Sequence, residues 1–120
     1  MGVKFYTYPS CSTCGNAKKW LEENDIEFEQ IHLINETPSA ADIKAMMEIG
    51  DVEPKQFFNS RGKKYRDLNL KDQIDDMDID KMVTLLASDG MLIKRPIVTD
   101  GTKVTVGFKE DIYNEKWLQK

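Results

Sequence analysis

The residues most able to do chemistry are the two cysteines, Cys11 and Cys14, which are three positions apart. A disulfide that closes so short a loop constrains the unfolded chain weakly, so reactivity explains the pair better than structural stapling does. Cys11 lies where a strand-like segment gives way to a helical one, and the N–H groups and dipole of a helix N-terminus stabilise a thiolate. We therefore expect Cys11 to be a nucleophile and Cys14, one helical turn later, to resolve a mixed disulfide formed on Cys11.

Two other interpretations of the cysteine pair stay open. A closed zinc site needs four ligands, and His32 is the only further soft ligand in the chain, so a zinc site could exist only if two subunits shared it. The second alternative is a pair of inert buried thiols, which strand-to-helix turns seldom provide. We expect no bound metal, and we expect His32 to be structural because no acid partner accompanies it in the sequence.

Hydroxyl groups and an arginine could assist the cysteines. Ser12 and Thr13 could hydrogen-bond a substrate or a thiolate, but both residue types also cap helices, and capping is the favoured interpretation. Pro96 directly precedes a strand-like segment, which suits the first position of a strand or a cis turn. If that turn packs beside the cysteines, Arg95 could present its planar, charged guanidinium to an oxyanion or to the Cys11 thiolate. An ordinary surface arginine is the alternative.

The first third of the sequence predicts the elements that position the cysteines. Residues 3–8 are rich in β-branched and aromatic side chains and end at a Pro-Ser turn, which indicates a buried strand. Ala17, Trp20 and Leu21 recur at helical spacing and predict a helix over 13–24. Alternating apolar residues predict a strand over 26–33, parallel to the first strand.

The middle of the chain is predicted to be helical. A helix should run from caps near Ser39 to Gly50, with three apolar residues on one face. Segment 54–70 is polar and contains a basic cluster, expected to be a solvated loop, of Arg61, Lys63, Lys64 and Arg66. A further helix is predicted over 78–89, with Gly90 as its C-terminal cap.

The end of the chain predicts two short strands, 97–99 and 103–106, joined by an Asp100-Gly101 hairpin turn, and a last helix over 108–118. The order is therefore β-α-β, a helical middle and β-β-α. This order predicts an α/β fold of thioredoxin-like (glutaredoxin-like) type, with a mixed four-stranded sheet and a helical insertion over 39–89. We expect residues 1–120 to form a single domain.

Charge and hydropathy exclude several classes of function. A formal net charge of −4 leaves no bulk attraction to nucleic acid or to anionic lipid. No apolar run approaches the roughly 18 residues that a membrane-spanning helix needs, and the N-terminal residues lack the pattern of a secretion signal. We therefore expect a cytoplasmic protein that binds neither nucleic acid nor a membrane directly.

Three segments together resemble a known family. They are YPSCSTC at 8–14, followed by Asn16, then LIKRPIV at 92–98 and VGF at 106–108. In these segments the chain resembles the ArsC/Spx family, which comprises glutaredoxin-like arsenate reductases and Spx- and MgsR-type transcription regulators. The resemblance spans nearly the whole chain, and two separated motifs are more specific than a bare C-x-x-C.

The resemblance implies a thioredoxin fold with a helical insertion. It also implies that Cys11 forms an arsenate adduct or a mixed disulfide, that Arg95 binds an anion and that Pro96 is a cis-proline. No bound cofactor is implied, and an external reductant, thioredoxin or glutathione with glutaredoxin, would supply electrons. The phosphatase-like class of arsenate reductases is excluded, because its C-x5-R loop would require arginine at the position of Ala17.

The sequence departs from the reductase pattern in two places. Cys14 adds a second thiol, as in Spx-type regulators, and the family's trio of arginines is incomplete: Arg95 matches, Arg61 could replace the middle one, and residues 106–109 contain none. The favoured hypothesis is a thiol-disulfide oxidoreductase of arsenate reductase type. The alternative is an Spx-like redox switch that binds the α subunit of RNA polymerase near Gly50-Asp51 and does not read DNA.

Overall fold

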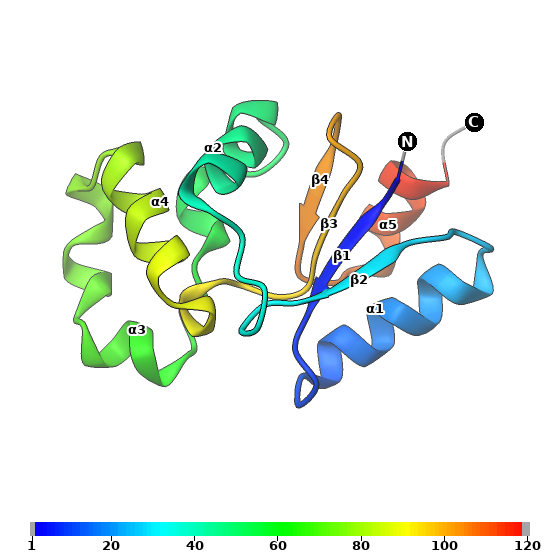
Figure 1. Ribbon diagram of the computed structural model, residues 1–120, viewed down its shortest axis with the longest axis horizontal. Coiled ribbons are helices and arrows are strands. Elements are labelled where there is room, and N and C mark those ends of the chain that lie inside the picture. The colour runs from blue at the N-terminus through cyan, green and yellow to red at the C-terminus, as the bar shows by residue number, and fades with distance from the viewer. Residues whose placement is uncertain (1, 119–120) are drawn as a thin grey trace.

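The computed structural model describes residues 2–118 and contains a four-stranded mixed sheet in the order β2-β1-β3-β4 (Figure 1). Its strands are β1 (Lys4–Thr7), β2 (Glu29–His32), β3 (Ile97–Thr99) and β4 (Val104–Val106). Strands β1 and β2 are parallel, and the pairs β1–β3 and β3–β4 are antiparallel. The predicted thioredoxin-like fold class is therefore confirmed.

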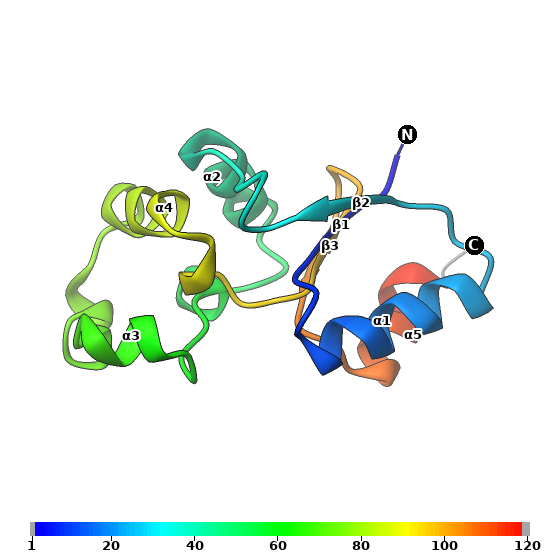
Figure 2. The same cartoon turned by 60° about the horizontal axis from the view of Figure 1, so that its bottom comes forward.

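Two helices cover one face of this sheet, α1 (Ser12–Glu23) and α5 (Glu110–Trp117) (Figures 1 and 2). The face of α1 predicted from helical spacing is buried, and it packs with Phe5 and Val98 of the sheet and with Tyr113 of α5. Phe5 and Val98 are opposite each other in the β1–β3 register. The N-terminal end of α1 is thereby held at the end of β1, where the cysteines lie.

The helical middle of the chain packs on the other side of the sheet (Figure 2). It contains α2 (Ala40–Ile49), α3 (Lys63–Asp67) and α4 (Ile79–Ser88), with single 3₁₀ turns at Pro54–Phe57, Leu70–Asp72, Ile74–Asp76 and Gly90–Leu92. As predicted, α2 begins at Ser39, whose hydroxyl accepts from the Asp42 N–H, and ends at Gly50 with φ 87°. Within residues 2–118 no helix combines the length and apolarity that crossing a membrane requires.

The basic cluster at 61–66 is exposed as expected, but most of it lies on helix α3 and not in a loop, and segment 54–70 is not polar throughout. This segment contains α3 and a 3₁₀ turn, and it buries Phe57, Phe58 and Tyr65. Phe58 forms an isolated antiparallel bridge with Ile93, and the Phe57 carbonyl accepts from the Lys94 N–H at 2.8 Å. These aromatic residues have neither helical nor strand periodicity, so their burial follows from tertiary contacts. The contacts connect the segment to the residues that precede Pro96.

Gly90 also has a different role from the predicted one. The C-terminal cap of α4 is Asp89, in extended conformation, and Gly90 is buried in the following 3₁₀ turn. A Cβ atom at this position would collide with the carbonyl oxygen of Leu33. Glycine is therefore required here for a close approach of two backbone segments.

The boundaries of the other elements are close to the predicted ones, except that β2 begins three residues later than expected. Ile26 and Phe28 precede the strand and pack against the core on the α1 side. The predicted hairpin between β3 and β4 is confirmed, with Gly101 at φ 93°.

Candidate active site

Cys11 is the N-terminal cap of α1, immediately after the turn that ends β1. Its Sγ atom accepts a hydrogen bond of 3.2 Å from the backbone N–H of Cys14. The prediction that hydroxyl groups cap this helix is wrong, because the cap position falls on Cys11 and leaves Ser12 and Thr13 inside the first turn. A hydrogen bond to an anion is stronger than one to a neutral acceptor, so the Cys14 N–H is placed to interact with negative charge that develops on Cys11 Sγ.

Cys14 differs from Cys11 in its surroundings. Both residues are free cysteines, but Cys14 is only 2% exposed whereas Cys11 is partly exposed. Burial raises the pKa of the Cys14 thiol to about 11, and a hydrogen bond with the Cys11 side chain acts in the same direction. Cys14 therefore keeps its proton at neutral pH, and the accessible sulfur of the pair belongs to Cys11.

Arg95 lies beside this turn, and its peptide bond to Pro96 is cis, as the family resemblance implied. The guanidinium carbon lies 4.9 Å from the centre of the Tyr8 ring, a cation–π distance. Its Nη1 atom is buried and has no hydrogen-bond partner among residues 2–118. Buried donors are almost always paired in native proteins, so this nitrogen is available to an anion.

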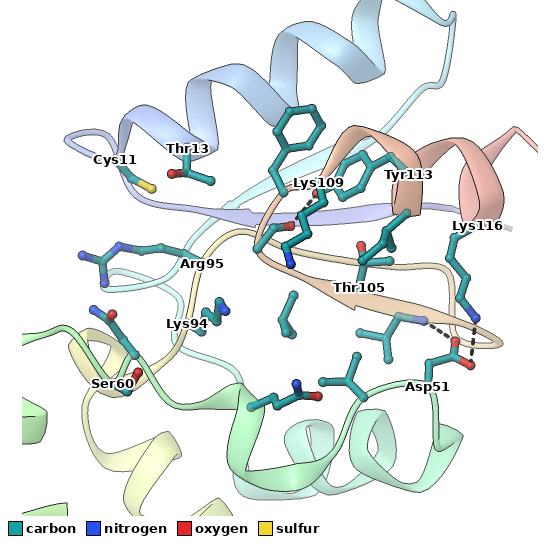
Figure 3. Close-up of a pocket in the computed structure, with 18 of the residues that line it drawn as sticks. Cys11, Thr13, Asp51, Ser60, Lys94, Arg95, Thr105, Lys109, Tyr113 and Lys116 are labelled. Carbon is teal, nitrogen blue, oxygen red and sulfur yellow. Dashed lines mark hydrogen bonds and ion pairs between the residues drawn. The ribbon is translucent and has the colours of Figure 1, made fainter. Parts of the chain in front are cut away.

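Cys11 and Arg95 lie at one end of a cleft of about 650 Å³ (Figure 3). One wall is formed by β4 and the start of α5, and the other by residues between α2 and α3. At the opposite end, Lys116 and Asp51 form an ion pair of 3.2 Å. The cleft therefore extends well beyond the Cys11 sulfur.

The comparison of this chain with known proteins identifies its family. The sequence profile of the ArsC family matches residues 6–116. The chain belongs to the ArsC family.

The relatives of this ArsC family chain include an uncharacterized protein, a transcriptional regulator and a possible arsenate reductase. The uncharacterized protein YusI of Bacillus subtilis is 54% identical over 117 residues, which cover 98% of this chain and 99% of that protein. The global transcriptional regulator Spx of Lactiplantibacillus plantarum is 32% identical over 109 residues, which cover 91% of this chain and 81% of the regulator. A solved structure described as a possible arsenate reductase, from Streptococcus mutans, is 39% identical with a TM-score of 0.85, and the match covers 92% of this chain and 96% of that one.

The ArsC fold brings together only some of the residues singled out from the sequence. Cys11, Thr13, Arg61 and Arg95 line the cleft, whereas Pro96 is buried and Ser12 is exposed outside it. The lining also includes Asp51, which the sequence suggested only as part of a protein contact, and three lysines that were not expected at the site, Lys94, Lys109 and Lys116.

A signal for two of these charged residues was present in the sequence. Lys94 directly precedes Arg95 within one of the family motifs, and Lys109 follows the motif in which the family's third arginine is missing. Both positions carry a lysine, whereas the family pattern consists of arginines. The cleft therefore has more positive charge than the incomplete arginine trio suggests.

Two further residues, Asp51 and His32, make structural contacts around the site. The carboxylate of Asp51 accepts from the Val104 N–H at 3.1 Å, which ties the end of α2 to the edge strand β4. His32 Nδ1 accepts from the backbone N–H groups of Ile34 and Asn35, and the ring makes an edge contact with Tyr8. The contacts of His32 are those of a structural residue in this ArsC family chain.

Proposed function

We propose that this chain is a thiol-disulfide oxidoreductase in which Cys11 is the nucleophile and Cys14 is the resolving thiol. The observation that carries the proposal is the 3.2 Å hydrogen bond from the Cys14 N–H to Cys11 Sγ, at a turn shared with the unpartnered Nη1 of Arg95. Together these donors stabilise negative charge on sulfur and on a bound anion.

The reaction proceeds in two exchanges. The Cys11 thiolate attacks one sulfur of a substrate disulfide, and the other substrate sulfur leaves as a thiolate that takes up a proton. Cys14 then loses its proton and attacks Cys11 Sγ, which releases the first substrate sulfur as a thiolate. The two electrons come from the cysteine pair, which ends as a disulfide. An external thiol, either thioredoxin or glutathione with glutaredoxin, reduces this disulfide again.

An oxyanion such as arsenate is the second substrate to test. Attack of Cys11 on arsenic would displace hydroxide and form a bond between Sγ and arsenic. Attack of Cys14 on Cys11 Sγ would then leave the bonding pair on arsenic and release arsenite. Arg95 would bind the oxyanion, assisted by Arg61 and Thr13, which line the same cleft.

The test is NADPH consumption by the purified protein with arsenate or with a small disulfide. The thioredoxin system and the glutathione–glutaredoxin system are supplied in separate reactions. We expect turnover that Cys11→Ser abolishes, and the system that supports turnover identifies the reductant. Cys14→Ser should trap the mixed disulfide, which mass spectrometry detects. A protein that turns over neither substrate, or in which Cys11→Ser retains full activity, contradicts the proposal.

The second candidate function is redox-controlled binding to the α subunit of RNA polymerase. It is favoured by the second thiol at Cys14 and by the 32% identity to a regulator named Spx. Gly50, at the exposed C-terminal end of α2, would lie at the contact. Pull-down of the purified α subunit with the reduced and with the oxidised protein tests this candidate, and no binding in either state rules it out.

A further inference from the structure

Polar contacts do not set the direction in which the Arg95 guanidinium points. Its Nη1 atom is buried without a hydrogen-bond partner, and no carboxylate of residues 2–118 lies within 4.0 Å of the group. An arginine side chain has many rotamers, and holding it in one of them requires contacts that offset the lost conformational freedom. Another kind of contact must therefore hold the guanidinium beside the cysteine turn.

The face of the Tyr8 ring supplies that contact. The guanidinium carbon lies 4.9 Å from the ring centre, within the distance at which an aromatic face attracts a cation. A carboxylate in the same place would also restrain the arginine, but it would accept hydrogen bonds from the guanidinium and occupy its donors. The aromatic face restrains Arg95 and leaves those donors free for an anion.

The backbone of Tyr8 belongs to the turn that leads to Cys11. The Tyr8 carbonyl oxygen accepts from the Cys11 N–H at 3.1 Å, and Pro9 occupies the second position of this four-residue turn, where its fixed φ is favourable. One residue therefore connects the two groups of the site, since its main chain closes the cysteine turn and its side chain contacts the Arg95 guanidinium.

His32 restrains the Tyr8 ring from the neighbouring strand β2. The two rings make an edge contact, with their centres 5.9 Å apart and their planes at 72°. The imidazole is itself fixed, because its Nδ1 atom accepts from the backbone N–H groups of Ile34 at 3.1 Å and of Asn35 at 3.2 Å. A ring held by two such hydrogen bonds gives the Tyr8 side chain a rigid neighbour.

We propose that Tyr8 is a positioning residue, which holds the Arg95 guanidinium at the cysteine turn with its donors free for an anion, and that His32 supports Tyr8. Among the described residues that line the hollow beside both rings there is no carboxylate, so none competes there for the guanidinium. This inference rests on the proposed function, because the anion is the substrate that Cys11 attacks. Neither ring touches the anion, so both residues act only through Arg95.

The experiment measures alkylation of Cys11 by iodoacetate and by iodoacetamide, which share a leaving group and differ in charge. Mass spectrometry gives both rate constants at low ionic strength, and their ratio cancels changes in the reactivity of the thiol itself. Arg95→Gln defines the ratio without the guanidinium. Tyr8→Leu should lower the ratio of iodoacetate to iodoacetamide about threefold to tenfold, toward the Arg95→Gln value. Tyr8→Phe keeps the aromatic face and should restore the ratio to within about twofold of that of the unmodified protein.

A substitution at His32 tests the support of the Tyr8 ring and leaves Tyr8 in place. The side-chain oxygen of His32→Asn can still accept from the Ile34 and Asn35 N–H groups, so the variant removes only the ring edge. We expect the ratio to fall about twofold. Because Tyr8 is unchanged, this variant decides the matter if Tyr8→Leu does not fold, and a ratio equal to that of the unmodified protein would then overturn the proposal.

A double variant separates positioning from a general loosening of the turn. If Tyr8 acts through Arg95, Tyr8→Leu should not change the ratio further in the Arg95→Gln protein. An equal loss with and without Arg95, or a Tyr8→Leu ratio that is unchanged, would overturn the positioning role, whatever the turnover. A ratio that depends on Tyr8, in a protein that turns over neither arsenate nor a small disulfide, would support the positioning role and contradict the proposed function.

Discussion

The two faces of the sheet are packed with different kinds of side chain. The face under α1 and α5 has an aromatic core in which Trp20 and Phe108 each make an edge contact with Tyr113. Two of its aromatic side chains donate buried hydrogen bonds, Tyr113 to the Gly107 carbonyl and Trp117 to the Thr105 hydroxyl. The face toward the helical middle is mainly aliphatic and methionine-rich, and a larger set of residues contributes to it.

The two cores position different parts of the candidate site. Cys14 belongs to the aromatic core, where directional contacts limit how its thiol can move. The residues between α2 and α3 that form one wall of the cleft are attached to the aliphatic core, which adapts more readily to substitution. The position of the proposed resolving thiol and the shape of the cleft therefore depend on different cores, so mutations should separate them.

The largest expected effect comes from a cavity in either core. Leu21 and Leu86 are both 0% exposed, one on each side of the sheet. Leu21→Ala and Leu86→Ala should each lower the free energy of unfolding by about 2–5 kcal/mol, measured by urea denaturation. Under native conditions only Leu21→Ala should increase the reactivity of Cys14 toward a thiol reagent. Equal exposure of Cys14 in both variants would contradict the separation of the two cores.

The next effect follows from the pKa of Cys14, which burial raises from an ordinary 9.0 to about 11. Between these values the folded protein binds the proton more tightly than the unfolded chain does, so stability is complete below pH 9 and falls as the pH rises toward 11. The loss should be on the order of 2 kcal/mol. The free energy of unfolding is measured across this pH range for the reduced protein and for Cys14→Ala, because the difference removes the contributions of lysines and tyrosines. If the two proteins show the same pH dependence, the contribution of the Cys14 thiol is refuted.

A smaller loss is expected from Tyr113→Phe. The Tyr113 hydroxyl donates to the carbonyl oxygen of Gly107 at 3.1 Å, and both groups are buried. The variant should lose about 1–2 kcal/mol of stability because the carbonyl is left without this donor. Urea denaturation measures this loss, and a variant as stable as the parent protein would contradict it.

The smallest effect should come from the far end of the cleft. Asp51→Asn removes the partly exposed ion pair with Lys116, but its amide oxygen can still accept from the Val104 N–H. We expect a stability change below about 1 kcal/mol. A double-mutant cycle with Lys116→Met measures the coupling, and a coupling well above that value would mean that this ion pair links the two cores.

The fold was predictable from the sequence wherever a local pattern decides it. The helix that contains Ala17, the caps of α2 at Ser39 and Gly50, and the Asp100-Gly101 hairpin were all expected from spacing and turn chemistry. Residues 54–70 were not, because Phe57 and its neighbours are buried by partners distant in the sequence. The role of Gly90 likewise depends on a contact with Leu33 that no local pattern contains.

In the candidate site, too, some residues were evident from the local sequence and others are brought together only by the fold. Cys11, Cys14 and Arg95 were selected because their chemistry is evident from residue type and motif. Lys94 and Lys109 meet in the cleft only because the β3–β4 hairpin folds back on itself, and a lysine alone carries no positional signal. The capping role of Cys11 was missed because hydroxyl groups are the commoner caps.

The cap at Cys11 connects the redox state of the cysteine pair to the stability of helix α1. A sulfur engaged in a mixed disulfide or in a bond to Cys14 carries less negative charge than a thiolate, and it is a weaker acceptor for the Cys14 N–H. In the proposed reaction we therefore expect oxidation to weaken the first turn of α1, and we expect the capping free energy lost in that step to contribute to the reduction potential of the pair. The Cys14 amide proton should therefore exchange with solvent faster in the oxidised protein than in the reduced protein.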